Sequence, residues 1–168
     1  DDCQDGVHAV EKGDFKTAYK LWLPLAEQGE AAAQYNLGLI LYYYIGDGEP
    51  NYKEAVKWYH RSAEQGEAQA QYNLGVMYHL GNGVAQNYKE AVKWYRLSAE
   101  QGHLSAQHNL GLMFADGKGV PQDYALAYMW WNIAGSNGHK DSIENRGVAE
   151  ERMSSSQIEK AQELTRQW

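Results

Sequence analysis

Tryptophans recur at a fixed interval in this chain: the steps between Trp22, Trp58, Trp94 and Trp130 are 36, 36 and 36 residues. Each tryptophan lies in a similar phrase, of which Ala91–Tyr95 (AVKWY) is one copy. A second phrase, QYNLG or QHNLG, recurs between them and starts at Gln34, Gln71 and Gln107. Self-similarity at such a period is the signature of a repeat architecture, in which stacked copies build one continuous core.

Bulk properties limit the class of protein and of partner. The 168 residues are enough for one domain. A net charge of −7 and a pI near 5.3 argue against nucleic acid as a partner, because phosphate binding needs a basic face. No run of about 18 apolar residues is present, so we predict no membrane insertion.

Cys3 is the single cysteine of the chain. A lone cysteine excludes an intramolecular disulfide framework and a cysteine-rich metal site. We expect a frayed terminal residue, with pairing to another chain or a reactive thiol as the alternatives. The sequence begins at Asp1 without a methionine, as a chain that has lost a signal peptide would, and as a trimmed chain would.

Each repeat has the pattern of two helices. In the second repeat, Ala70, Leu74 and Tyr78 mark the inner face of a first helix, which stops at the glycines of 81–83. The second helix has its own buried face, predicted from the same spacing. Its inner residues are Ala91, Trp94, Tyr95 and Ala99.

The pattern predicts a single repeat domain over residues 1–168. Its parts are a half unit (1–29), three repeats (30–66, 67–102 and 103–138), and a C-terminal helix with a cap (139–168). The half unit holds helices near 2–12 and 14–28, with Asp14 as N-cap and Pro24 inside the second. A helix over 140–152 follows the repeats, and Ser154–Gln157 forms a capping box that opens the last helix. That helix departs from the repeat because a terminal element must cover the open end of the core.

One repeat differs in length. The step from Gly38 to Gly46 is eight residues, whereas the matching steps in the next two repeats are six. The two extra residues fall in Leu41–Ile45 (LYYYI), at the end of the first helix. Local insertions of this kind map to a loop or helix end on one face of a stack.

Four phrases of the second repeat together resemble a Sel1-like repeat, a relative of tetratricopeptide repeats. They are AQYNLGVMY from Ala70, GNGV from Gly81, YKEAVKWY from Tyr88 and AEQG from Ala99. The likeness extends from about Asp14 to the last helix. It implies an all-α, right-handed α-solenoid of antiparallel helix pairs, whose first helices line a concave groove.

The same resemblance implies a function and a location. Members are mostly non-enzymatic adaptors for proteins or peptides, and bacterial members are often exported. We therefore expect a periplasmic or secreted bacterial protein, with a cytoplasmic one left open. Cysteine-rich relatives that bind penicillin or hydrolyse β-lactams carry a disulfide in every repeat, which this chain lacks.

Candidate binding residues come from the first helices. In tetratricopeptide relatives an asparagine at this helix position often holds a peptide backbone, which by resemblance selects Asn36, Asn73 and Asn109. An amide suits that task because it both donates and accepts hydrogen bonds. The alternative is that these asparagines satisfy groups inside the stack, since they recur in every repeat.

Outward helix positions add further candidates. Tyr35, Tyr72, Tyr42 and Tyr43 would form an aromatic wall suited to protein contacts. For Tyr42 and Tyr43 the alternative is a helix extension whose rings pack on each other or on the half unit. His79 and His108 occupy comparable groove positions, and two unpaired surface histidines fit them better than a metal site.

Motifs for catalysis are missing. The sequence has no HExxH, no Walker motif, no GxSxG and no SxxK, and its Gly-x-Gly pairs lack the flanking strand and third glycine of a phosphate cradle. We therefore predict no enzyme activity, no metal and no cofactor, and a protein or peptide ligand in the concave groove. A hydrolase and a self-associating scaffold are the two alternatives, and the oligomeric state stays open.

Overall fold

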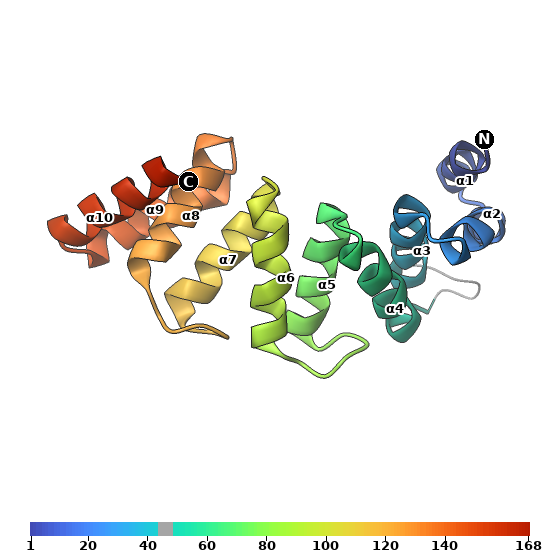
Figure 1. Cartoon of the computed structure of the whole chain (residues 1–168), viewed down its shortest axis with the longest axis horizontal. Coiled ribbons are helices and arrows are strands. Elements are labelled where there is room, and N and C mark those ends of the chain that lie inside the picture. Colours follow the sequence, from blue (N-terminus) through green and yellow to red (C-terminus); the bar gives the residue numbers. More distant parts are fainter. Residues whose placement is uncertain (44–48) are drawn as a thin grey trace. The chain divides into compact units, whose positions relative to one another are not determined.

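The computed structural model describes residues 1–43 and 49–168, and within them all regular structure is helical. Consecutive helices run back and forth as pairs (Figure 1). Their bounds are α1 Asp2–Glu11, α2 Phe15–Glu27, α3 Ala31–Tyr43, α4 Tyr52–Glu64, α5 Ala68–Leu80, α6 Tyr88–Glu100, α7 Leu104–Asp116, α8 Tyr124–Ser136, α9 Lys140–Arg152 and α10 Ser155–Gln167. This is the predicted all-α repeat architecture. The predicted insertion at Leu41–Ile45 lies partly outside the described residues, since α3 is described to Tyr43.

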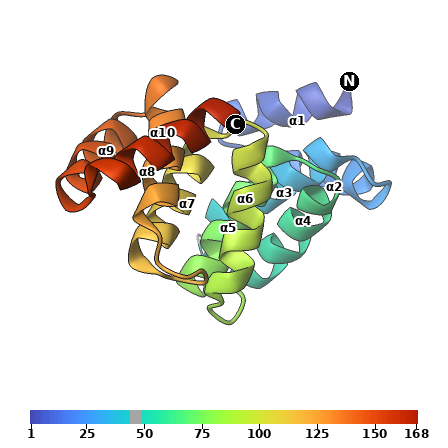
Figure 2. The same ribbon diagram turned by 60° about the vertical axis from the view of Figure 1, so that its left-hand side comes forward.

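The chain divides into two compact units. The N-terminal unit, Asp1–Gln86, contains α1 to α5, and the C-terminal unit, Asn87–Trp168, contains α6 to α10. Helices adjacent in sequence pack on one another from α1 to α5 in the first unit and from α6 to α9 in the second. In the C-terminal unit α10 also packs back on α8, which covers the end of the core (Figure 2).

Local sequence signals set the helix ends. Asn51 and Asn87 begin α4 and α6, where each side chain accepts a hydrogen bond from a backbone N–H, at 3.2 and 3.1 Å. Gly81 ends α5 with φ 74°, a left-handed conformation that favours glycine. The predicted N-cap at Asp14 and the capping box at Ser154 are both present. Helix α2 continues through Pro24 to Glu27.

The predicted inner faces are largely buried. All four residues predicted for the second helix of the second repeat are at most 3% exposed, as are Ala70 and Leu74. Tyr78 is half-buried, so its assignment to the inner face was wrong, and Met77 is fully buried instead. In α10, Ala161 is buried, whereas Trp168 stays 54% exposed with its ring edge on Trp130.

The four tryptophans spaced 36 residues apart do not all occupy the same position in the repeat. Trp22 covers Gly6 of the first helix, as Tyr59 covers Gly38 and Trp131 covers Gly111. The Trp22 and Trp131 indoles also donate equivalent hydrogen bonds, to the carbonyls of Cys3 and His108, each at 3.1 Å. The alignment of Trp22 with Trp58 was therefore wrong. Its cause is the first step between repeats, which is 37 residues from Ala18 to Ala55.

The recurring glutamines connect successive helix pairs. Gln34, Gln71 and Gln107 are almost fully buried, and each side-chain amide donates to the carbonyl eight residues earlier, at 3.0, 3.2 and 3.1 Å. Those carbonyls belong to the last turn of the preceding second helix, where backbone oxygens lack helical partners. The repeated QYNLG phrase thus maintains the stack.

Candidate functional site

Two pockets lie side by side on the N-terminal unit. The first has a volume of about 270 Å³ and is formed by α1, α2 and α3. Its lining is apolar apart from an asparagine and a tyrosine, and it contains no charged side chain. The lining residues are Val10, Phe15, Trp22, Asn36, Leu39, Ile40 and Tyr43.

The second pocket is bounded by phenol rings. Its volume is about 160 Å³, and α3, α4 and α5 contribute its walls. The lining residues are Tyr42, Tyr43, Tyr59, Tyr72, Asn73 and Val76. Tyr43 belongs to both pockets, so the two hollows form one surface, which we call the tyrosine strip.

Tyr42 and Tyr43 have different environments although they are neighbours. Tyr42 is half-buried: its ring lies 4.8 Å from that of Tyr43 and 5.1 Å from that of Tyr52, and its phenol hydrogen-bonds the Asn82 side chain. Burial, and then the neighbouring Tyr52, raise the pKa of the Tyr42 phenol. Tyr43 is 57% exposed and stands between the pockets. The packing alternative thus describes Tyr42, whereas the exposed ring of Tyr43 stays a candidate for protein contacts.

Asn73 is the centre of a hydrogen-bond network. Its side-chain oxygen accepts from Gln69 at 3.2 Å, and its amide hydrogen-bonds the phenols of Tyr35 and Tyr59. Tyr59 is 1% exposed, and burial strongly raises the pKa of its phenol; burial also raises the pKa of Tyr35. Asn73 therefore fixes the floor of the second pocket. Tyr59, which is equivalent to the predicted core residue Tyr95, also lines the strip, from the second-helix side.

The other two asparagines have no such network. Asn36 and Asn109 are half-buried, and neither side chain hydrogen-bonds another residue within 1–43 or 49–168. Asn36 lies in the wall of the apolar pocket. The three repeated asparagines are therefore not equivalent in structure, although nothing in the repeated phrase distinguishes them.

His79 and His108 lie in different units. His79 is half-buried in the last turn of α5, and its carbonyl accepts a hydrogen bond from Gln86 at 2.9 Å. His108 lies in α7, where its ring stacks on that of His139 with centroids 4.6 Å apart. The Ser142 hydroxyl is within hydrogen-bond distance of both rings, 2.9 Å from His108 Nδ1 and 3.0 Å from His139 Nδ1.

The contacts of this histidine–serine cluster cap a helix and bury its polar groups. His139 is also the N-cap of α9, since its Nδ1 accepts from the Ser142 backbone at 3.3 Å. Burial, followed by the neighbouring His139, lowers the pKa of His108, while Asp141 acts in the opposite direction. Ser142 is 0% exposed, so no substrate can reach its hydroxyl.

A pocket of the C-terminal unit contains a residue that the sequence reasoning missed. Its volume is about 180 Å³, and its lining includes two charged residues, Asp116 and Arg152. The lining residues are Leu112, Ala115, Asp116, Tyr124, Trp131, Asn145, Val148, Ala149 and Arg152. Asn145 lies 36 residues after Asn109, so continuing the same period would have found it.

Two other features are absent from the described residues, a cluster of metal ligands and a membrane-spanning helix. Within 1–43 and 49–168, no three or more histidine, cysteine, aspartate or glutamate side chains are grouped to hold a metal ion. No helix in those ranges has the length and apolar character needed to cross a membrane.

Comparison with solved structures gives three useful relatives. A protective antigen of uropathogenic Escherichia coli strains with an SLR fold is 38% identical, with a TM-score of 0.83 over 90% of this chain and 32% of its own. A Sel1 repeat protein from Oxalobacter formigenes is 33% identical, with a TM-score of 0.80 over 87% of this chain and 60% of its own. This chain thus spans about a third and three-fifths of those two proteins. Cysteine-rich protein B of Helicobacter pylori shares the fold at 20% identity, with a TM-score of 0.60 over 78% of this chain and 93% of its own.

The family comparison agrees with these structures. No sequence among curated proteins matches this chain. The family model of the Sel1 repeat matches residues 3–30, 31–67, 68–103 and 104–139, the first of which is the shorter segment that precedes Ala31. The chain therefore belongs to the Sel1 repeat family, whose members are generally scaffolds for protein interactions rather than enzymes.

Proposed function

We propose that this protein is a non-enzymatic scaffold that binds a protein or peptide segment on the tyrosine strip of its N-terminal unit. The observation that carries the proposal is Tyr43, a 57% exposed aromatic ring between two hollows. Exposed rigid aromatics beside pockets are typical anchors of protein contacts, because they bury a large area at little entropic cost.

The lining suggests which side chains would bind. Neither pocket contains a charged residue, so apolar or aromatic side chains suit both. A bound segment would place one such side chain on each side of Tyr43. The Asn36 amide, which has no partner in the described part of the chain, is available to hold the backbone of that segment. Tyr35 and Asn73 would act indirectly, by fixing Tyr59 in the pocket floor.

The proposal is tested with peptides selected from a random display library on the wild-type chain. One selected peptide is synthesised with a fluorophore, and its affinity is measured by anisotropy. We expect Tyr43→Ser to weaken binding by about tenfold or more, as for an interface hot spot of about 1.4 kcal/mol. Asn109→Ala in the C-terminal unit is the matched control and should bind as wild type. Equal affinity for Tyr43→Ser would contradict the proposal.

An exported location belongs to the same proposal. It is supported by the bacterial origin of the solved relatives and by the description of one of them as a protective antigen. The test is fractionation of the source cell, with immunoblotting of the cytoplasmic, periplasmic and secreted material. A purely cytoplasmic signal would contradict this part of the proposal.

A further inference from the structure

A second surface lies on the outer side of α6, in the C-terminal unit. It is a shallow hollow of about 450 Å³ between α6 and the segment that follows α7. Three cations lie next to three apolar side chains in its lining. We call it the basic groove, formed by Lys89, Val92, Lys93, Arg96, Leu97 and Val120.

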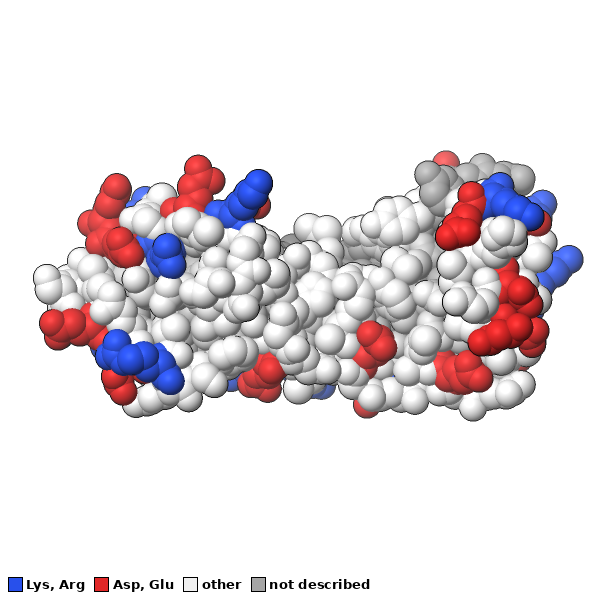
Figure 3. All heavy atoms as spheres, turned by 90° about the horizontal axis from the view of Figure 1, so that it is seen from above, with Lys and Arg blue, Asp and Glu red and all other residues white. Residues whose placement is uncertain are grey.

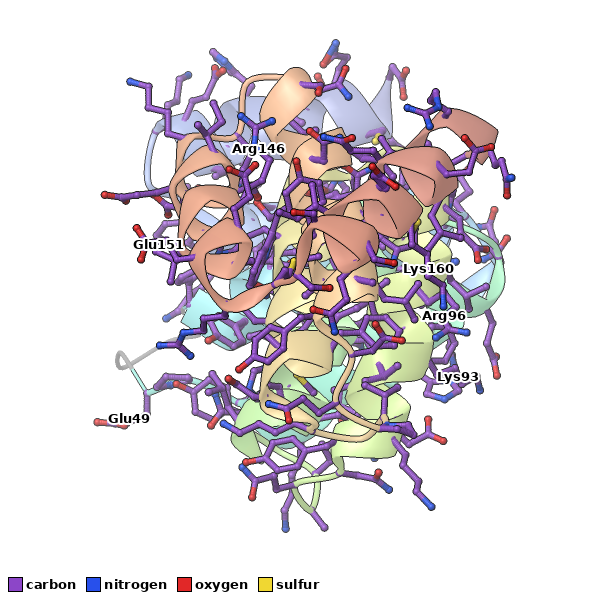
Figure 4. The ribbon with its side chains drawn as sticks, turned by 90° about the vertical axis from the view of Figure 1, so that its left-hand side faces the viewer. Glu49, Lys93, Arg96, Arg146, Glu151 and Lys160 are labelled. Atoms are coloured by element: carbon purple, nitrogen blue, oxygen red, sulfur yellow. The ribbon has the colours of Figure 1, made fainter. Side chains whose placement is uncertain are left out.

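The cations of the groove follow the helix. Lys89, Lys93 and Arg96 are spaced four and three residues apart, so all three share one face of α6. Figure 4 shows Lys93 and Arg96 projecting outward on the same side. Lys93 Nζ lies 4.7 Å from the centroid of the Trp94 ring, and the Arg96 guanidinium lies 5.9 Å from that of Phe114. These cation–π contacts hold both charges in place along the groove.

Within the described residues, none of the three cations forms an ion pair. Comparing α4 with α6 shows that the lack of ion pairs is not common to all repeats. The nine residues 51–59 and 87–95 are identical in sequence, yet in α4 Lys57 Nζ lies 3.7 Å from Glu54. In α6 the matching Lys93 is over the Trp94 ring instead.

The two helices differ just beyond the shared phrase. Arg61 of α4 is replaced by Leu97 in α6, and Leu97 is 39% exposed. Of the two valines in the lining, Val120 is half-buried and Val92 is only 6% exposed. The groove thus combines positive charge that forms no ion pair with an exposed leucine, a combination found where a partner binds more often than on a plain solvated face.

We propose that the basic groove binds an acidic protein segment that carries an apolar side chain between its carboxylates. Charge complementarity selects this occupant, because three unpaired cations face solvent on a chain whose net charge is −7. A short acidic segment would contact the three cations alone, whereas an extended anionic membrane or nucleic acid would also face the acidic remainder of the chain, which would repel it. This inference is independent of the tyrosine strip, which lies on the other unit.

The test uses a synthetic helical peptide with glutamates spaced like the three cations and leucines beside them. Its affinity for the whole chain is measured by fluorescence anisotropy. We expect Lys89→Gln/Lys93→Gln/Arg96→Gln to weaken binding about tenfold, the size expected of three exposed ion pairs. The control, Lys53→Gln/Lys57→Gln/Arg61→Gln on α4, removes the same number of positive charges and should bind like the wild type. A peptide with glutamine in place of each glutamate should bind weakly to all three proteins.

Several results would overturn the inference. Equal affinity of the α6 variant and the wild type would do so, as would equal affinity of the glutamine peptide. Leu97→Arg, which restores the residue of α4, should also weaken binding; no loss would remove the apolar part of the proposal.

A second copy of the chain is the rival occupant. Acidic side chains gather over the end that carries α1 and α2 in the N-terminal unit (Figure 3). The first turn of α1 contains Asp2 and Asp5. Sedimentation velocity without peptide would detect such pairing as a concentration-dependent mass. Self-association that the α6 variant abolishes would replace the acidic segment with a second copy.

Discussion

The two units of this protein are built from one repeat, and each has a pocket at the matching place of its helices, but the walls of the two pockets differ. On the N-terminal unit, Tyr42 and Tyr43 of α3 line a hollow of about 160 Å³, and Tyr43 stays exposed. On the C-terminal unit, Ala115 and Asp116 of α7 stand at the same helix positions, in a hollow of about 180 Å³ that also contains Arg152. The repeated residues therefore maintain the stack, whereas the positions that vary set the chemistry of the pocket walls.

Single substitutions change the contacts of these first helices. The position of Tyr35 and Tyr72 is His108 in the third repeat, and the position of Ala70 and Ala106 is Ser142 in α9. A hydroxymethyl group replaces a methyl group at this fully buried site, and its hydroxyl lies 2.9 Å from His108 Nδ1.

The largest expected effect is a loss of stability in the C-terminal unit when Trp131 is removed. Trp131 is 4% exposed, covers Gly111 and donates to the His108 carbonyl. We expect Trp131→Ala to lower the free energy of unfolding by about 3–5 kcal/mol, measured by urea denaturation. Hydrogen exchange should show the loss of protection first in α7 to α9, with α1 to α3 less affected. A loss below about 1 kcal/mol would mean that this aromatic position does not hold the helix pair together.

The next effect concerns the close contact between helices that the glycines allow. A methyl group at Gly38 would lie 2.5 Å from the Tyr59 ring, which is buried and cannot give way. Gly38→Ala should therefore cost about 1–3 kcal/mol in thermal or urea unfolding. Gly147→Ala in α9 is the matched control, since no neighbouring atom lies within 4 Å of the position that its Cβ would take. It should be neutral or stabilising by up to about 1 kcal/mol, and equal costs at both sites would contradict this explanation.

A smaller effect distinguishes two asparagines that the repeat makes equivalent. Asn73→Ala removes a partner of the buried Tyr59 phenol and should cost about 1–2 kcal/mol of stability. Asn36→Ala should change stability by less than about 0.5 kcal/mol, because its amide has no partner in the described residues. Affinity for a selected peptide should fall in Asn36→Ala. A larger loss of stability in Asn36→Ala than in Asn73→Ala would contradict these two roles.

The smallest effect is a pH dependence of the C-terminal unit. Burial lowers the pKa of His103 and of His108, and His103 Nδ1 caps α7 by accepting from Ala106 at 3.1 Å. The unfolded chain, with histidine pKa values near 6.5, then binds more protons than the folded chain. The stability contributed by these residues is complete above about pH 6.5 and is lost as the pH falls through the lowered values.

The measurement is urea unfolding between about pH 7.5 and 5, for the wild type and for His103→Asn. Asparagine retains an N-cap acceptor but does not titrate, so this variant should lose less stability on acidification. His8→Asn on exposed α1 is the control and should follow the wild type. An unchanged pH profile in His103→Asn would show that His103 does not cause the pH dependence.

Much of the fold follows from the sequence, because repetition makes each prediction several times over. The helix pairs, the caps at Asp14 and Ser154 and the buried second-helix faces are all as predicted. The register of Trp22 was missed, since equal spacing concealed a 37-residue step. Tyr78 was misplaced because a rotation of one residue along a helix separates a buried side chain from a half-buried one.

The candidate site was less predictable. The sequence identified Tyr43 and Asn36 as candidates, but it could not tell them from Tyr42 and Asn73, whose side chains are engaged in the structure. The stacking of His108 on His139 depends on residues 31 positions apart in different helices. Such contacts arise from the packing of neighbouring repeats, which a residue pattern does not encode.

Hydrogen exchange on the whole chain, with and without a peptide selected from a display library, would show directly which surface binds. We predict that bound peptide increases protection in α3 and α5 of the N-terminal unit, and leaves α7 and α9 of the C-terminal unit unchanged. Protection confined to α7 and α9 would contradict this prediction, and would mean that the pocket of the C-terminal unit rather than the tyrosine strip is the binding surface.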